Sequence, residues 1–173
     1  EQVFLEGPKD AIQVTLDGTT YDLPTREAEA ERFAGLRCAV TLNKNNDLKW
    51  IHDWAHFHVQ RHGMEGVALV DNGSTDYSVE DVRQTLASVA GLKEAVVYSA
   101  KFPYGPLGHR GGKKNPLPKF FQSAMLNLMR DDTMPFARSV LNCDIDEMVL
   151  GPKGHSIFEA TERHPLGMIT FLG

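Results

Sequence analysis

Two aspartates separated by one apolar residue stand late in the chain, in the run Asp144, Ile145, Asp146 and Glu147. In an extended backbone, residues i and i+2 project to the same side, so both carboxylates can face one ligand while Ile145 packs inward. Paired carboxylates suit Mg²⁺ or Mn²⁺, which complete their shells with water and phosphate oxygens. Largely apolar flanks predict a partly buried acidic cluster. The residues alone also allow two solvated aspartates at a strand end.

A second polar segment, residues 71–76, reads Asp-Asn-Gly-Ser-Thr-Asp directly after an apolar run. Gly73 permits a positive φ, and the short polar side chains and backbone donors suit contact with a base, a ribose or a phosphate. The same residues are also ordinary turn chemistry, with Asp76 as a helix cap, and the hexapeptide alone favours that interpretation.

Histidines form a third group. His52 and His56 are spaced i,i+4, and with Asp53 they come within one substitution of the zinc-protease helix motif. Asp53 is one methylene shorter than the glutamate of that motif, and no clear third ligand follows. We therefore interpret these residues, with His58 and His62, as structural or surface histidines, His58 being on the core face.

A long connection rich in glycine, proline and lysine, residues 101–119, is a candidate active-site loop. Its Arg110, Lys113 and Lys114 are candidates for contact with a diphosphate or an acceptor, because a cationic loop can close over an anionic ligand. The alternative is a solvated surface loop.

Hydrophobic periodicity predicts strands and helices in alternation from residue 36 onwards. The predicted strands are residues 36–42, 67–70, 95–98 and 138–143, and the predicted helices are residues 47–61, 79–90 and 120–130. Expected caps are Asn45 or Asn46 for the first helix and Ser78 or Asp76 for the second. This order indicates an α/β fold with a mainly parallel, Rossmann-like nucleotide-binding sheet and flanking helices, in which ligands lie beyond the carboxyl ends of the strands.

The N-terminal fifth of the chain differs in pattern. Residues 2–5, 12–16 and 19–23 suggest short strands, and residues 26–34 a short helix. We predict two units: a small β appendage with a linker helix over residues 1–35, and the nucleotide-binding domain over residues 36–173. The last residues, 169–173, suggest an apolar strand.

Composition and charge disfavour some partners and locations for the chain. The 173 residues carry 18 Lys and Arg against 23 Asp and Glu, a net charge of −5, which disfavours nucleic acid as a partner. No apolar run is long enough to span a membrane, and the first residues do not resemble a signal peptide. Two cysteines in apolar runs, Cys38 and Cys143, indicate buried thiols and a reducing compartment. We expect a cytoplasmic chain, which could lie peripheral to a membrane.

Together, these motifs resemble the glycosyltransferases of the GT-A nucleotide-sugar fold, with the closest match to the family 2 and family 92-like group. The resemblance spans residues 36–150 and rests on Asp53-Trp54, His58, Gly63, the loop at residues 71–76 and the run at residues 142–147, in this order. It implies a metal-dependent transfer of a sugar from a nucleoside-diphosphate sugar, with a UDP-sugar favoured, to a hydroxyl of a glycan or another acceptor in glycan or polysaccharide synthesis.

The resemblance also implies a site. Asp71 or Asn72 would lie nearest the base, Asp144 would face the ribose or the metal, and Asp146 would bind Mn²⁺ or Mg²⁺ directly. The implied nucleotide-binding residues are Thr41, Asn43, Asp71, Asn72 and Asp144.

The chain departs from this pattern after the aspartates. Complete domains of the group continue further, so we expect a C-terminally incomplete domain whose catalytic base lies beyond the chain. Acids and histidines of the tail without a recognisable motif are His155, Glu159, Glu162 and His164. Alternatives are a non-catalytic nucleotide-binding or sugar-binding domain, and a phosphohydrolase with Asp144 as nucleophile and Asp146 as acid. The phosphohydrolase is weakened because Glu147-Met148 replaces the threonine that its motif requires.

Overall fold

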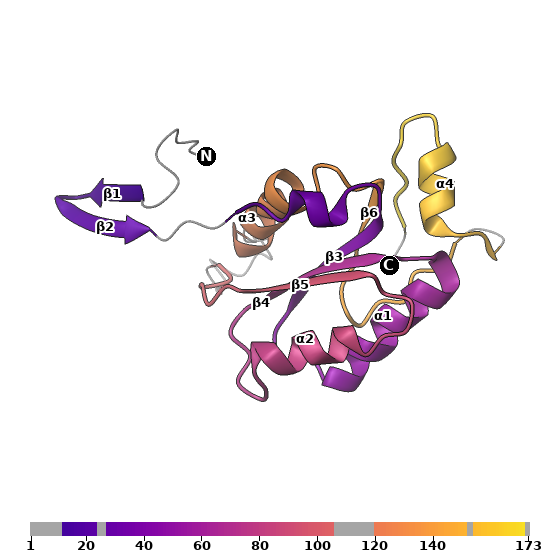
Figure 1. The fold of residues 1–173 in the computed structure, drawn as a ribbon, viewed down its shortest axis with the longest axis horizontal. Helices are drawn as coiled ribbons and strands as arrows, with labels where there is room; N and C mark the ends of the chain where they lie inside the picture. The colour runs from indigo at the N-terminus through magenta and orange to yellow at the C-terminus, as the bar shows by residue number, and fades with distance from the viewer. Residues whose placement is uncertain (1–11, 24–26, 106–119, 152–153, 172–173) are drawn as a thin grey trace, which may run out of the picture.

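A parallel sheet forms the centre of the chain in the computed structural model, which describes residues 12–23, 27–105, 120–151 and 154–171 (Figure 1). Its strand order is β5-β4-β3-β6, and every neighbouring pair is parallel. The strands are β3 (Arg37–Asn43), β4 (Gly66–Asp71), β5 (Glu94–Ser99) and β6 (Ser139–Asn142). The expected α/β fold with a mainly parallel sheet and flanking helices is confirmed.

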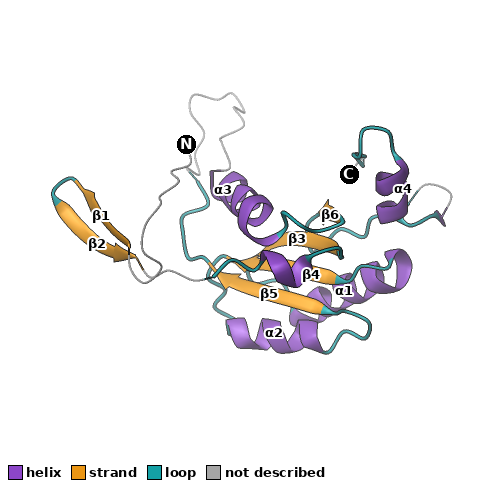
Figure 2. Cartoon of the chain, turned by 45° about the horizontal axis from the view of Figure 1, so that its top comes forward, coloured by secondary structure: helices purple, strands orange, loops and turns teal. Residues whose placement is uncertain are grey.

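Helices lie on both faces of this sheet (Figure 2). On one face, α1 (Leu48–His62) and α2 (Val79–Ala87) pack against each other. On the other face lie α3 (Phe120–Leu128), the π-helical turn Met129–Thr133 and a short 3₁₀ helix, Ala30–Phe33. Two hydrophobic cores result, because β3, β4 and β5 direct alternate apolar side chains to opposite faces.

The strand order reverses at β3. The chain runs from β3 to β4 to β5 on one side and then returns through α3 to place β6 on the other side of β3. Strands β3 and β6, far apart in the sequence, are therefore neighbours in the sheet. Cys38 and Cys143 are free and buried, but they pack into the cores on opposite faces. Burial raises the pKa of Cys38 to about 12 and that of Cys143 to about 11.

Helix α1 is amphipathic and has well-defined ends. Its cap is Asp47, whose side chain accepts from the Lys49 N–H at 2.8 Å, and not Asn45 or Asn46 as expected. The two asparagines lie outside the helix because Asn45 takes a positive φ of 53° and bonds the loop after β4. The helix ends at Gly63, in the left-handed region at φ 70°.

One face of α1 is buried and the opposite face is exposed. Ile51, Trp54 and Ala55 are fully buried. Val59 is only partly buried at the edge of the core. The exposed face includes Lys49, Gln60 and Arg61.

Ser78 caps α2, one of the two residues predicted. Its hydroxyl accepts from the Asp81 N–H at 3.2 Å, and Asp81 accepts from the Ser78 N–H at 2.8 Å, which forms a capping box. The helix ends at Ala87, three residues before the predicted end at Ala90, because the chain turns before Gly91, whose φ is 92°.

Replacing the cap should destabilise the chain modestly. We expect Ser78→Ala to lower the free energy of unfolding by about 1 kcal/mol, because the hydroxyl satisfies an N–H of the first turn that has no partner within the helix. Urea unfolding measures the change. Ser88→Ala, which removes a hydroxyl bond to the Thr85 carbonyl at the other end of the helix, should cost less, and equal losses would contradict the capping role.

The N-terminal hairpin pairs β1 (Ile12–Leu16) with β2 (Thr19–Leu23) in antiparallel register, as predicted. The helix predicted over residues 26–34 is reduced to the single 3₁₀ turn Ala30–Phe33, which buries Phe33 against the sheet. Residues 2–5 lie outside the described residues. The division of the chain at residue 35 stays a prediction.

The C-terminal part contains a helix that the sequence pattern did not predict, α4 (Ile157–Arg163). Its first residues, Ile157 and Phe158, join the core beside α1. Arg37 donates to both oxygens of Glu162, at 2.8 and 3.0 Å, and this partly buried pair lowers the pKa of Glu162. The strand expected at residues 169–173 is wrong for residues 169–171, which form no regular structure, and the last two lie outside the description.

Candidate functional site

A cleft of about 580 Å³ opens at the carboxyl ends of the parallel strands. Residues from the end of every strand line it: Asn43 of β3, Asn72 after β4, Phe102 after β5, and Asp144 and Asp146 after β6. The cleft includes the point where the strand order reverses, and open parallel sheets bind ligands at such points because the loops diverge there.

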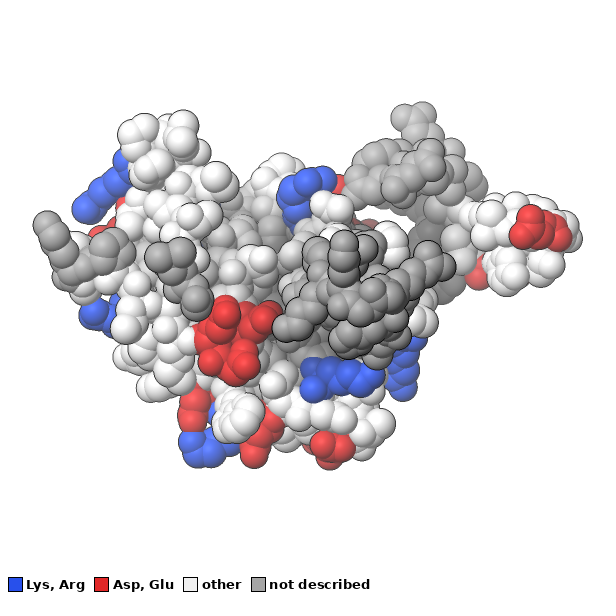
Figure 3. All heavy atoms as spheres, turned by 180° about the vertical axis from the view of Figure 1, so that it is seen from behind, with Lys and Arg blue, Asp and Glu red and all other residues white. Residues whose placement is uncertain are grey.

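Both carboxylates of the predicted metal site line this cleft. Ile145 between them is 4% exposed and packs into the core, so the predicted alternation is present. The prediction of a partly buried cluster is wrong, because Asp144 and Asp146 are exposed. The chain turns at Ile145 and Asp146 directly after β6, which brings the carboxylates to solvent. Figure 3 shows acidic side chains gathered on one face of the molecule.

Glu147 closes the turn that holds these aspartates. Its carboxylate accepts from the Asp144 N–H at 3.3 Å, and its own N–H donates to the Asp144 carbonyl at 3.1 Å. The described residues contain no group of three or more His, Cys, Asp or Glu arranged around a common cation. A cation between Asp144 and Asp146 would therefore draw most of its ligands from water and from a bound anion, which is the usual pattern for Mg²⁺.

Asp71 is buried and holds the loop that follows β4. Its Oδ1 accepts from Asn43 Nδ2 at 2.8 Å and from the Ser74 hydroxyl at 2.5 Å, while its Oδ2 accepts from the Ser74 N–H at 2.9 Å. It does not line the cleft. Asp71 thus stabilises the turn, whereas Asp76, the cap expected by the turn interpretation, does not cap α2, because Ser78 does. Direct contact of Asp71 with a nucleotide stays a prediction.

Asn72 lines the cleft and joins two strand ends. Its Nδ2 donates to the carbonyls of Ala100 and Phe102, at 2.8 Å each. Thr41 is buried beneath the strand ends and does not line the cleft, and its hydroxyl has no hydrogen-bond partner among the described residues. Arg110, Lys113 and Lys114 lie outside the described residues.

Several residues that line the cleft were not predicted from the sequence. Lys44 and Asn46 follow β3, Phe102 and Tyr104 follow β5, and Gln122 lies in the first turn of α3. Phe102 and Tyr104 were not predicted as lining residues, because only the cations of the loop at residues 101–119 suggested contact with a ligand. Tyr77 was missed as well: its hydroxyl donates to the Asn46 carbonyl at 2.6 Å and fixes the loop after β3.

The histidines of α1 form no metal site in the described structure. His52 and His56 stack at the surface with ring centroids 5.9 Å apart. His58 is fully buried, and its Nδ1 lies 2.8 Å from the Trp54 carbonyl. His62 lies 2.8 Å from the Val149 carbonyl through Nε2 and accepts from the Ile157 N–H through Nδ1 at 3.3 Å, which ties α4 to α1. The structural interpretation of His58 and His62 agrees with these contacts.

His58 should make stability depend on pH. Burial lowers its pKa from 6.5 to about 4, with the neighbouring His62 adding to the effect, so the unfolded chain binds this proton more readily than the folded chain. The stabilisation is complete above about pH 6.5 and is lost as the pH falls toward 4, a loss of about 3 kcal/mol. Urea unfolding between pH 7 and 4 measures it, and His58→Gln should flatten most of the slope. An unchanged slope would contradict the assignment.

Comparisons with models of known protein families, with curated proteins and with solved structures each found no match. In the part of the chain that the structure describes, no helix combines the length and apolar character needed to cross a membrane.

Proposed function

We propose that the cleft binds a nucleoside-diphosphate sugar through Mn²⁺ or Mg²⁺ held by Asp144 and Asp146. The chain would then be the nucleotide-sugar-binding domain of a metal-dependent glycosyltransferase. One observation carries the proposal: two carboxylates from one turn open into a cleft at the carboxyl ends of a parallel sheet, where its strand order reverses. The motif resemblance to the GT-A glycosyltransferases supports the same function.

The chemistry follows from charge. A cation bridging Asp144, Asp146 and the donor diphosphate would offset the negative charge that develops on the departing nucleoside diphosphate. Lys44 lines the same cleft and adds a positive charge suited to a phosphate oxygen. Arg110, Lys113 and Lys114 stay candidates for the diphosphate or the acceptor.

Amide side chains supply the remaining polar groups. Asn43, Asn46 and Asn72 line the cleft between the carboxylates after β6 and the segment after β5. The Asn72 Nδ2 already donates to the Ala100 and Phe102 carbonyls, and the Asn43 amide is bonded to Asp71, Tyr77 and Asn46. The Oδ1 of Asn72 and the amide of Asn46 are therefore the groups that suit the hydroxyls of a ribose or of a sugar. The acceptor is a glycan or another hydroxyl compound, and we assign no catalytic base. The cytoplasmic location expected from the two cysteines belongs to this proposal.

A thermal-shift screen tests the proposal. The chain is melted with UDP, GDP, CDP or ADP, each with Mn²⁺ and with EDTA in its place. We expect one nucleotide, UDP by the resemblance, to raise the melting temperature only with Mn²⁺, since a ligand that binds the folded state alone stabilises it. No shift with any nucleotide, or equal shifts in EDTA, would contradict the proposal. Phosphate release during incubation would favour the phosphohydrolase instead.

A further inference from the structure

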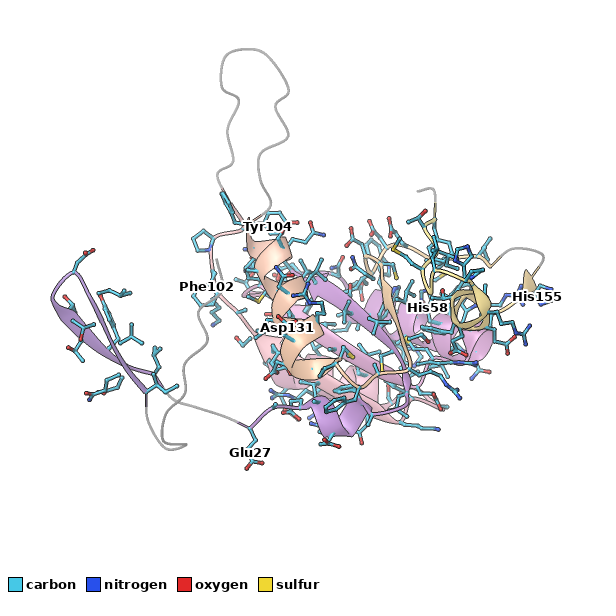
Figure 4. The ribbon with its side chains drawn as sticks, turned by 90° about the horizontal axis from the view of Figure 1, so that it is seen from above. Glu27, His58, Phe102, Tyr104, Asp131 and His155 are labelled. Atoms are coloured by element: carbon cyan, nitrogen blue, oxygen red, sulfur yellow. The ribbon has the colours of Figure 1, made fainter. Side chains whose placement is uncertain are left out.

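Two aromatic side chains after β5 form one wall of the cleft. Phe102 is 64% exposed and Tyr104 is 38% exposed, and both line the space that Asp144 and Asp146 also line. Figure 4 shows both residues on the segment that leads from β5 to α3. We propose that the nucleobase binds at this wall by stacking on the two rings. This inference rests on the proposed function.

The loop after β4 is poorly suited to that role. Both oxygens of Asp71 already accept hydrogen bonds, from Asn43 and Ser74, and the side chain is 2% exposed. Reading a base with this carboxylate would break bonds that hold the loop, and a buried carboxylate without partners is costly. Contact of the base with the Asp71 carboxylate is therefore disfavoured.

The aromatic segment is held in place from both sides. The Phe102 carbonyl accepts from Asn72 at 2.8 Å, which anchors the segment to β4. The Tyr104 carbonyl accepts from the Phe121 N–H at 3.2 Å, which anchors it to α3. The Tyr104 ring packs on the buried ring of Phe121, with centroids 5.9 Å apart. These contacts fix the backbone of the segment and the Tyr104 ring, so Tyr104 loses little conformational entropy when a planar ligand stacks on it.

One amide lies beside the Tyr104 ring. Gln122 accepts from the Tyr104 hydroxyl at 3.2 Å through Oε1, and the amide of Asn46 lines the same cleft. Aromatic rings that stack a base, flanked by amides that contact its edge, are the usual means by which proteins hold a nucleobase.

The test compares a ligand that has a base with one that has none. UDP and inorganic pyrophosphate are each titrated calorimetrically into the chain with Mn²⁺. We expect Phe102→Leu and Tyr104→Leu each to weaken UDP about 5- to 100-fold, as for the loss of one stacking ring, and to leave pyrophosphate unchanged. Tyr104→Phe keeps the ring and should retain UDP affinity. Phe136→Leu, at an exposed ring that does not line the cleft, is the matched control.

The outcomes separate the two proposals. If UDP with Mn²⁺ binds both leucine variants as tightly as the wild type, base stacking on this wall is refuted and the proposed function is unaffected. Equal weakening of UDP and pyrophosphate also refutes base stacking, because the rings would then act only on the shape of the cleft. If neither ligand binds the wild type with Mn²⁺, both the proposed function and base stacking on this wall are refuted.

Discussion

Asp146→Asn should abolish the Mn²⁺-dependent binding of UDP, with a loss of about 100-fold or more. Asparagine keeps the size of the side chain but removes the charge of a direct metal ligand. Changes to residues that only support the ligands already cost about 10- to 100-fold in metal affinity. Because Asp146 is exposed, the melting temperature without ligand should stay within a degree or two of the wild type. Isothermal titration of UDP with Mn²⁺ measures the loss.

Two further variants sharpen this prediction. Asp144→Asn should reproduce the loss, because both carboxylates come from the same turn and line the same cleft. Glu80→Gln removes an exposed carboxylate from α2, outside the cleft, and should leave UDP affinity unchanged. Affinity of Asp146→Asn within about threefold of the wild type would place the cation elsewhere.

Trp54→Ala should destabilise the chain by about 3 to 5 kcal/mol, the range for removing a large buried aromatic side chain. Trp54 is fully buried where α1 packs against the sheet, within the same core as Ile51 and Leu141. Its removal leaves a cavity between layers that are held in place by their packing. For a chain of this length, we expect the melting temperature to fall by about 6 to 20 °C.

The same helix supplies a matched control. Trp50 lies four residues earlier and is 56% exposed, so Trp50→Ala removes the same side chain with little change in burial. It should cost about 0.5 kcal/mol or less. Urea unfolding of the two variants gives the comparison, and similar losses at the two positions would contradict the assignment of Trp54 to the core.

The sheet and its helices were predictable because their signals are local. Buried strands such as β4 are continuous apolar runs, and α1 repeats its apolar residues with the period of a helix. Helix α4 was missed because its seven residues are stabilised by distant partners: Ser156 donates to the His62 carbonyl, and Glu162 pairs with Arg37. The cap of α1 was misassigned because Asn45 bonds Thr75, a contact between loops far apart in sequence.

In the candidate site, too, local features were predictable from the sequence and features that depend on distant partners were not. The alternation at Asp144, Ile145 and Asp146 is a local property, and it was predicted correctly, whereas their exposure depends on a turn that the sequence did not reveal. The wall of Phe102 and Tyr104 depends on long-range bonds, from Asn72 on one side and Phe121 on the other. The sequence pattern within residues 101–105 does not indicate Asn72 or Phe121 as partners.

The most direct test of the central claim is a crystal structure of the chain with UDP and MnCl₂, with diffraction recorded at the manganese absorption edge. We expect an anomalous peak within coordination distance of Asp146, bridged to the diphosphate in the cleft at the carboxyl ends of β3 and β6. A manganese peak away from Asp144 and Asp146, or UDP bound outside this cleft, would contradict it.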